Sequence, residues 1–244
     1  MTLIAAAMCP HPMSLIPEVA GEHAEWERLR ATCADSVRQL KVPVWDLKHK
    51  PPADARRLIV IVGGDDTTKD FHPRSYASLL ANGFYWARGW GQDDEAAQPL
   101  PLSLSIGYWL ISESRPEKRG MIWADIAYQA VDFYATPQEC AELGQDLAGR
   151  AEHVIMLVMG EGSSSMPATE QAKRAKLDGN VVRALEHADA DALLDSTEFP
   201  GLGRSAWRVL AAAAAGQHFQ GQLHWDERIE GRRYFVASWT QRGR

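Results

Sequence analysis

Three short and continuously apolar runs are spaced along the chain, and a polar tip follows each of them. They are LIAAA at 3–7, LIVIV at 58–62 and HVIMLVM at 153–159. Runs of this length without polar alternation are typical of strands that are buried on both faces of a parallel sheet. The pattern therefore predicts at least three neighbouring, buried strands.

Helical periodicity precedes the second and third runs. Between residues 18 and 40, apolar side chains recur at three- and four-residue steps, which predicts an amphipathic helix. Residues 136–152 give a second helix, with Thr136 as its N-cap and Pro137 at its first position. The alternation of strand and helix indicates βαβ units.

The remaining patterns complete one α/β domain over 1–244. Within 99–114 we expect a helix after a proline-rich entry. We also expect helices at 168–196 and 205–216, strand-like alternation at 120–135, and a terminal β-hairpin at 219–240. The predicted fold is a single-domain, doubly wound α/β sandwich with a largely parallel, mixed sheet. It has helices on both faces and a C-terminal hairpin.

Composition excludes two classes of partner. The net charge is −6 and the sequence has no basic stripe, so we expect no nucleic-acid partner. No window approaches the ~20 apolar residues of a membrane helix, so we expect no membrane partner. Three widely spaced cysteines are typical of reduced thiols, which predicts a cytoplasmic protein.

The polar tips carry the candidate chemistry. They are Cys9 and His11 after the first run, Asp65 and Asp66 after the second, and Glu161 with the serines 163–165 after the third. Open α/β sheets bind ligands beyond the carboxyl ends of their strands. Imidazole and carboxylate groups that converge there would suit a divalent metal, including Fe(II) held by two histidines and one carboxylate.

Each tip also has a simpler interpretation. His11 could be a rigid loop histidine that hydrogen-bonds to the backbone between its two prolines. Asp65 and Asp66 could cap the turn that follows them. The GEGSSS segment lacks a P-loop lysine and could be a plain connection. His72 could reach the same edge as a substitute ligand, or could be solvated.

The segment AAAMCPHPMSLIPEVAG at 5–21 resembles the N-terminus of the class III extradiol dioxygenase catalytic-subunit superfamily, the LigB-like group that includes Memo-like proteins. Further segments follow in the same order, among them IVIVGGDD, PLPLSLSIGYWL, LVMGEGSSS and GRSAWRVLAAAA. The resemblance implies a doubly wound α/β sandwich. It also implies Fe(II) held by two histidines and a glutamate, and oxygen-dependent cleavage of catechols.

Only some of the family's functional residues have a match in this sequence. His11 matches the first metal-ligand histidine, whereas the second-ligand position holds the pair Asp65–Asp66. Ser164 stands where the family has its acid/base histidine. Near GLGRSAW no residue matches the third ligand, and Glu198 is the nearest carboxylate.

Two hypotheses follow. In the first, His11 and Asp66, with Glu161 or His72, hold Fe(II) or another divalent metal in an enzyme with an altered ligand set. Asp65, or a water on Ser164, would then move protons on a small aromatic or polar substrate. In the second, the chain is a metal-free binding or assembly subunit. We also expect a homodimer.

Overall fold

The computed structural model describes residues 2–40, 57–88, 97–114, 125–162, 171–194 and 203–242. Two residues singled out from the sequence, Ser164 and Glu198, lie outside these ranges. The same holds for the ends of several predicted elements, including 120–124 and 195–196.

Ten strands are defined in the described ranges. The larger sheet contains β1 (Thr2–Cys9), β2 (Arg57–Asp65), β3 (Lys69–Phe71), β7 (Asp125–Asp132), β8 (His153–Met159), β9 (Phe219–Ile229) and β10 (Arg232–Gln241). A smaller sheet contains β4 (Tyr76–Ser78), β5 (Ala87–Arg88) and β6 (Pro99–Leu100). All three apolar runs are strands, as predicted.

The larger sheet is mixed, with a parallel centre. Its strand order is β3-β7-β2-β8-β1-β10-β9 in the described part of the chain. Strands β7, β2, β8 and β1 are parallel to one another. Strand β10 runs antiparallel to β1 and to β9, and β3 runs antiparallel to β7. The predicted mixed sheet and terminal hairpin are therefore confirmed.

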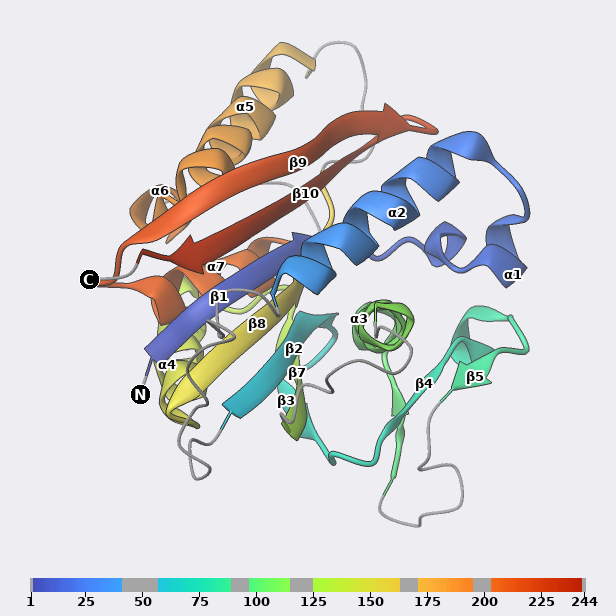
Figure 1. Ribbon diagram of the computed structural model, residues 1–244, viewed down its shortest axis with the longest axis horizontal. Coiled ribbons are helices and arrows are strands. Elements are labelled where there is room, and N and C mark those ends of the chain that lie inside the picture. Colours follow the sequence, from blue (N-terminus) through green and yellow to red (C-terminus); the bar gives the residue numbers. More distant parts are fainter. Residues whose placement is uncertain are drawn as a thin grey trace, which may run out of the picture.

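Helices cover both faces of this sheet (Figure 1). One core lies beneath α2 (Ala24–Gln39) and α3 (Leu102–Glu113). The other lies beneath α4 (Pro137–Gly149), α5 (Gln171–His187) and α7 (Arg204–Ala214). The shorter helical elements are η1 (Met13–Leu15), α1 (Pro17–Ala20), η2 (Leu80–Asn82) and α6 (Ala190–Leu194). The doubly wound prediction is confirmed.

Strand β1 shows why the central strands have no polar alternation. Its residues Ala5, Ala7 and Cys9 belong to the core beneath α2 and α3, whereas Leu3, Ala6 and Met8 belong to the opposite core. A strand covered by helices on both faces must be apolar at every position.

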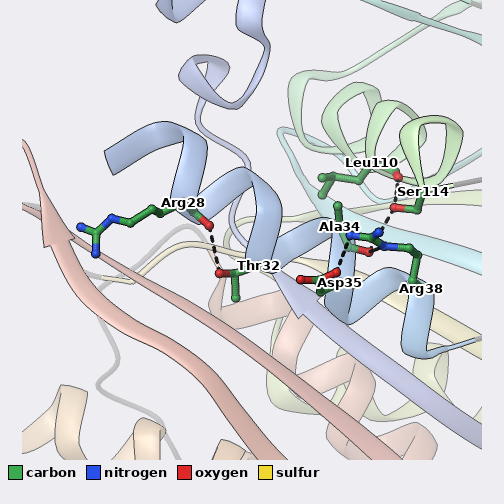
Figure 2. Close-up of polar contacts among 7 residues, drawn as sticks. All are labelled: Arg28, Thr32, Ala34, Asp35, Arg38, Leu110 and Ser114. Atoms are coloured by element: carbon green, nitrogen blue, oxygen red, sulfur yellow. Dashed lines mark hydrogen bonds and ion pairs between the residues drawn. The ribbon is translucent and has the colours of Figure 1, made fainter. Parts of the chain in front are cut away.

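Helix α3 is joined to α2 by a polar contact at its end (Figure 2). The hydroxyl of Ser114 donates to the Leu110 carbonyl at 2.6 Å and lies 3.4 Å from the Ala34 carbonyl. Ser114 is buried, so these bonds satisfy a hydroxyl that would otherwise cost free energy in the core. The contact joins the two helices that cover one face of the sheet.

The four short strands of the middle region were not predicted. Strands β3, β4, β5 and β6 are two or three residues long, which is too short for a periodic pattern. In contrast, α4 begins as predicted: Thr136 and Glu139 form a capping box, and Pro137 is at the first helical position.

Gly144 sets the distance between α4 and α7, and this predicts the result of a substitution. A Cβ at this position would lie 2.4 Å from the Val209 carbonyl oxygen and 2.7 Å from the Ala212 Cβ. Because the first of these atoms is backbone, the helices must separate. We expect Gly144→Ala to lose about 1–3 kcal/mol of unfolding free energy, measured by urea denaturation.

Gly149 is the matched control in the same helix, since no atom lies within 4 Å of a Cβ placed there. Gly149→Ala should leave the stability equal or slightly higher, because alanine favours helix over glycine. Equal urea midpoints for the two variants would contradict the close approach of α4 and α7.

Candidate functional site

The carboxyl ends of the parallel strands meet at one edge of the sheet, and β10 begins there. Strand β8 lies beside β1, and the Gly160 N–H donates to the Cys9 carbonyl at 3.0 Å just beyond both strands. Because β10 is antiparallel to β1, its first residues lie at this edge. Three segments far apart in the sequence therefore converge: 9–11, 160–162 and 232–234.

His11 is the buried imidazole of this edge. It leaves β1 between Pro10 and Pro12, and only 3% of it is exposed. Its Nδ1 is buried and has no hydrogen-bond partner in the described part of the chain. A buried polar atom without a partner is uncommon in folded proteins and points to a functional group or a missing ligand.

Glu161 is the buried carboxylate beside it, with 4% exposure. An Nη1 of Arg232 donates to its Oε2 at 3.3 Å. The glycines on either side allow this placement: a Cβ on Gly160 would lie 2.8 Å from the Gly203 Cα, and one on Gly162 would lie 2.4 Å from the Arg233 carbonyl oxygen. Neighbouring backbone therefore packs directly against the strand tip.

The charges of the cluster act on the pKa of His11. Burial lowers that pKa, the carboxylate of Glu161 opposes the shift, and the guanidinium of Arg232 adds to it. The net direction is downward from 6.5, so the imidazole is neutral at neutral pH. A neutral imidazole has one nitrogen that accepts a proton or a hydrogen bond.

Tyr234 completes the cluster from β10. Burial raises the pKa of its phenol, and the Glu161 carboxylate raises it further, so Tyr234 stays protonated. Its ring packs edge-on against Trp26 of α2, with the ring centroids 5.5 Å apart. The cluster formed by His11, Glu161, Arg232 and Tyr234 therefore combines a carboxylate, a guanidinium, a neutral imidazole and a neutral phenol.

The other predicted site residues lie elsewhere on the surface or edge. Asp65 is the half-buried last residue of β2, and Asp66 after it is exposed. His72 is exposed beyond β3, where its Nδ1 accepts a hydrogen bond from the Arg74 N–H at 3.3 Å. The charges that act on His11 are those of Glu161 and Arg232. The structure brings His11 and Glu161 together without Asp66 or His72.

The described donors do not complete a metal centre. A non-haem iron site of the kind that the resemblance implies needs two histidines and a carboxylate. His11 and Glu161 supply one of each, and Glu161 already binds a cation in Arg232. Within the described ranges, no group of three or more His, Cys, Asp or Glu side chains could hold a metal ion.

Sequence reasoning missed Arg232 and Tyr234. The terminal hairpin is the sequence feature that could have indicated these two residues. Its turn is formed by Glu230 and Gly231, with φ of 50° and 79°. Both angles are positive, as in the tight turns that join two strands. Pairing the hairpin antiparallel to β1 would have placed the residues after this turn beside His11.

Comparisons with known proteins bear on the fold. No family model matches the chain, and no curated protein matches it. Among solved structures, it is similar to the crystal structure of the uncharacterized protein JW3007 from Escherichia coli K12, with a TM-score of 0.52 and 11% identity. The match covers 97% of this chain and 99% of that one. The likeness concerns the fold alone.

In the described residues, no helix is both long and apolar enough to cross a bilayer.

The lowered pKa of His11 predicts a pH dependence of stability. The unfolded state has the ordinary histidine pKa of about 6.5, so it binds more protons than the folded state between the folded pKa and that value. The stabilising effect of a neutral His11 is therefore complete above about pH 6.5 and is lost as the pH falls below it.

Urea denaturation between pH 7.5 and 5, in the presence of a chelator, tests this effect. His11→Gln should lose stability less steeply than the wild type over this range. His72→Gln removes an exposed histidine and should follow the wild type. Parallel curves for His11→Gln and the wild type would contradict a lowered pKa of His11.

Proposed function

We propose that the chain is an enzyme that binds a small polar or aromatic molecule at the edge formed by β1, β8 and β10, and that His11 moves a proton in its reaction. One observation carries the proposal: the Nδ1 of the buried His11 has no partner in the described part of the chain, and the charge of the buried Glu161 carboxylate acts on this imidazole. The carboxyl edge of the parallel strands is where α/β folds place ligands.

The surrounding charges suit this role. A neutral imidazole can take a proton from a bound molecule, and the Glu161 carboxylate stabilises the imidazolium that results. Arg232 pairs with Glu161 through a hydrogen bond of 3.3 Å. The resemblance of residues 5–21 to the LigB-like group supports a small aromatic or polar molecule as the substrate class.

A fragment screen by NMR, observing the ring signals of His11, tests the proposal. Ligands of this site should shift those signals and should bind at least tenfold more weakly to His11→Ala. His72→Ala is the control, because His72 is exposed and lies outside the cluster. Ligands that bind both variants equally, or an absence of ligands, would contradict the proposal and favour the binding or assembly subunit.

Metal content separates the metal-dependent version of this enzyme from the metal-free one. Protein purified without oxygen is offered Fe(II) and Zn(II), and bound metal is measured by mass spectrometry. Stoichiometric metal that is lost in both His11→Ala and His72→Ala would support one ligand set expected from the sequence, in which His72 joins His11 and Asp66. Metal that is lost in neither would contradict a role of these residues as ligands.

A further inference from the structure

Arg232 connects the buried part of the site to solvent. Its guanidinium donates to Glu161, whose side chain is 6% exposed, while 52% of the Arg232 side chain is exposed. A guanidinium has five N–H donors in a planar fork. One edge of the fork therefore faces the buried carboxylate, and donors remain for a second acceptor on the solvent side.

The neighbouring arginines of the hairpin are held differently. Arg233 binds both carboxylate oxygens of Asp226, at 2.5 and 2.7 Å, and also contacts Asp178 at 3.3 Å. Arg228 contacts Asp178 at 3.5 Å and donates to the Gly231 carbonyl. Each of these two arginines contacts two protein groups, whereas Arg232 contacts Glu161 alone among the polar contacts of the described residues and belongs to the His11 cluster.

We propose that the ligand of this site carries an oxyanion, a carboxylate or a phosphate, which binds the solvent-side donors of Arg232 and brings the attached group to His11. The inference rests on the proposed function and names its substrate class. Glu161 fixes the orientation of the guanidinium from the other side, so the fork is already positioned when the ligand arrives. Charge-assisted bonds from arginine to oxyanions are short, directional and about twice as strong as neutral ones.

Calorimetric titration with benzoate, phenyl phosphate and benzamide tests the inference, because benzamide has the shape of benzoate without its charge. Benzoate or phenyl phosphate should bind the wild type at least tenfold more tightly than benzamide does. In Arg232→Gln this preference should disappear, with a loss of roughly tenfold or more in affinity for the anion. The tighter of the two anions identifies the oxyanion.

Arg232→Lys is the control for an effect on folding, because it keeps a cation beside Glu161 but lacks the planar guanidinium. It should melt at the wild-type temperature and still bind the anion more weakly. Arg88→Gln is the matched control: Arg88 is also about half exposed and pairs with a glutamate, Glu18, at 3.0 Å on α1. This variant should bind the anion like the wild type.

Three results would overturn the inference. An anion complex that weakens in His11→Ala but not in Arg232→Gln would support the proposed function while contradicting the role of Arg232. Equal affinities of the wild type for benzamide and benzoate would likewise contradict the role of Arg232. If neither anion binds the wild type, the oxyanion is wrong, and the fragment screen decides the proposed function separately.

Discussion

An Asp178→Ala variant is expected to lose about 3 kcal/mol of unfolding free energy. Asp178 lies on α5 with its side chain fully buried, and the guanidinium groups of Arg233 and Arg228 reach it from the hairpin. Removing one partner of a buried ion pair costs about 3–5 kcal/mol, because the remaining charge is left without compensation. The lower end applies here because Arg233 keeps its pair with Asp226 and the Arg228 side chain is about half exposed.

The exposed pair Arg28–Glu227 provides the control for this prediction. Its atoms lie 3.6 Å apart and both side chains are more than half exposed. Glu227→Ala should therefore change the stability by less than about 1 kcal/mol. Urea denaturation followed by circular dichroism measures both variants. A loss in Asp178→Ala as small as that in Glu227→Ala would mean that the hairpin does not depend on this buried aspartate.

A His11→Ala variant is expected to turn over the substrate found by the fragment screen roughly 10²–10⁴-fold more slowly than the wild type. The physical reason is that the variant lacks the group that exchanges a proton with the bound molecule. Glu161→Gln keeps the imidazole but removes the carboxylate that stabilises its charged form, so its kcat should lie between the two. Both are measured as initial rates at saturating substrate.

His72→Ala should retain the wild-type kcat, since His72 is exposed beyond β3. A His11→Ala enzyme with a wild-type kcat would remove His11 from the reaction and would leave the edge as a binding site only. Equal losses of kcat in His11→Ala and His72→Ala would instead indicate that both histidines belong to one site, as expected from the sequence.

Much of the fold could be predicted because its main signals are local. The central strands are buried on both faces, so their apolar runs are unbroken, and the α4 cap is contained within Thr136–Glu139. Strands β4, β5 and β6 could not be predicted. They are two or three residues long, and their pairing partners lie up to 23 residues away, as in Tyr76 with Pro99.

Part of the candidate site could be predicted for the same reason. His11 and Glu161 follow apolar runs directly, and the carboxyl ends of adjacent parallel strands share an edge. The position of Asp66 depended on strand order, which no local pattern encodes. Strand β8 lies between β2 and β1, so the tip of β2 is two strand spacings from His11, or about 10 Å.

Arg232 and Tyr234 reach the site through a pairing that spans nearly the whole chain. Met8 of β1 is paired with Ala237 of β10, and this register brings the start of β10 to the tip of β1. Sequence periodicity predicted the hairpin but not its neighbour in the sheet. Arg232, whose charge lowers the pKa of His11, and Tyr234 could therefore not be predicted from local patterns.

The pKa of His11, followed through its ring signals by NMR in the wild type, Glu161→Gln and Asp66→Asn, tests the central claim that His11 and Glu161 share one site. The wild-type pKa should lie below 6.5. It should fall further in Glu161→Gln, because the Glu161 carboxylate raises it, and should stay unchanged in Asp66→Asn. A pKa that responds to Asp66→Asn but not to Glu161→Gln would contradict the site described for this edge.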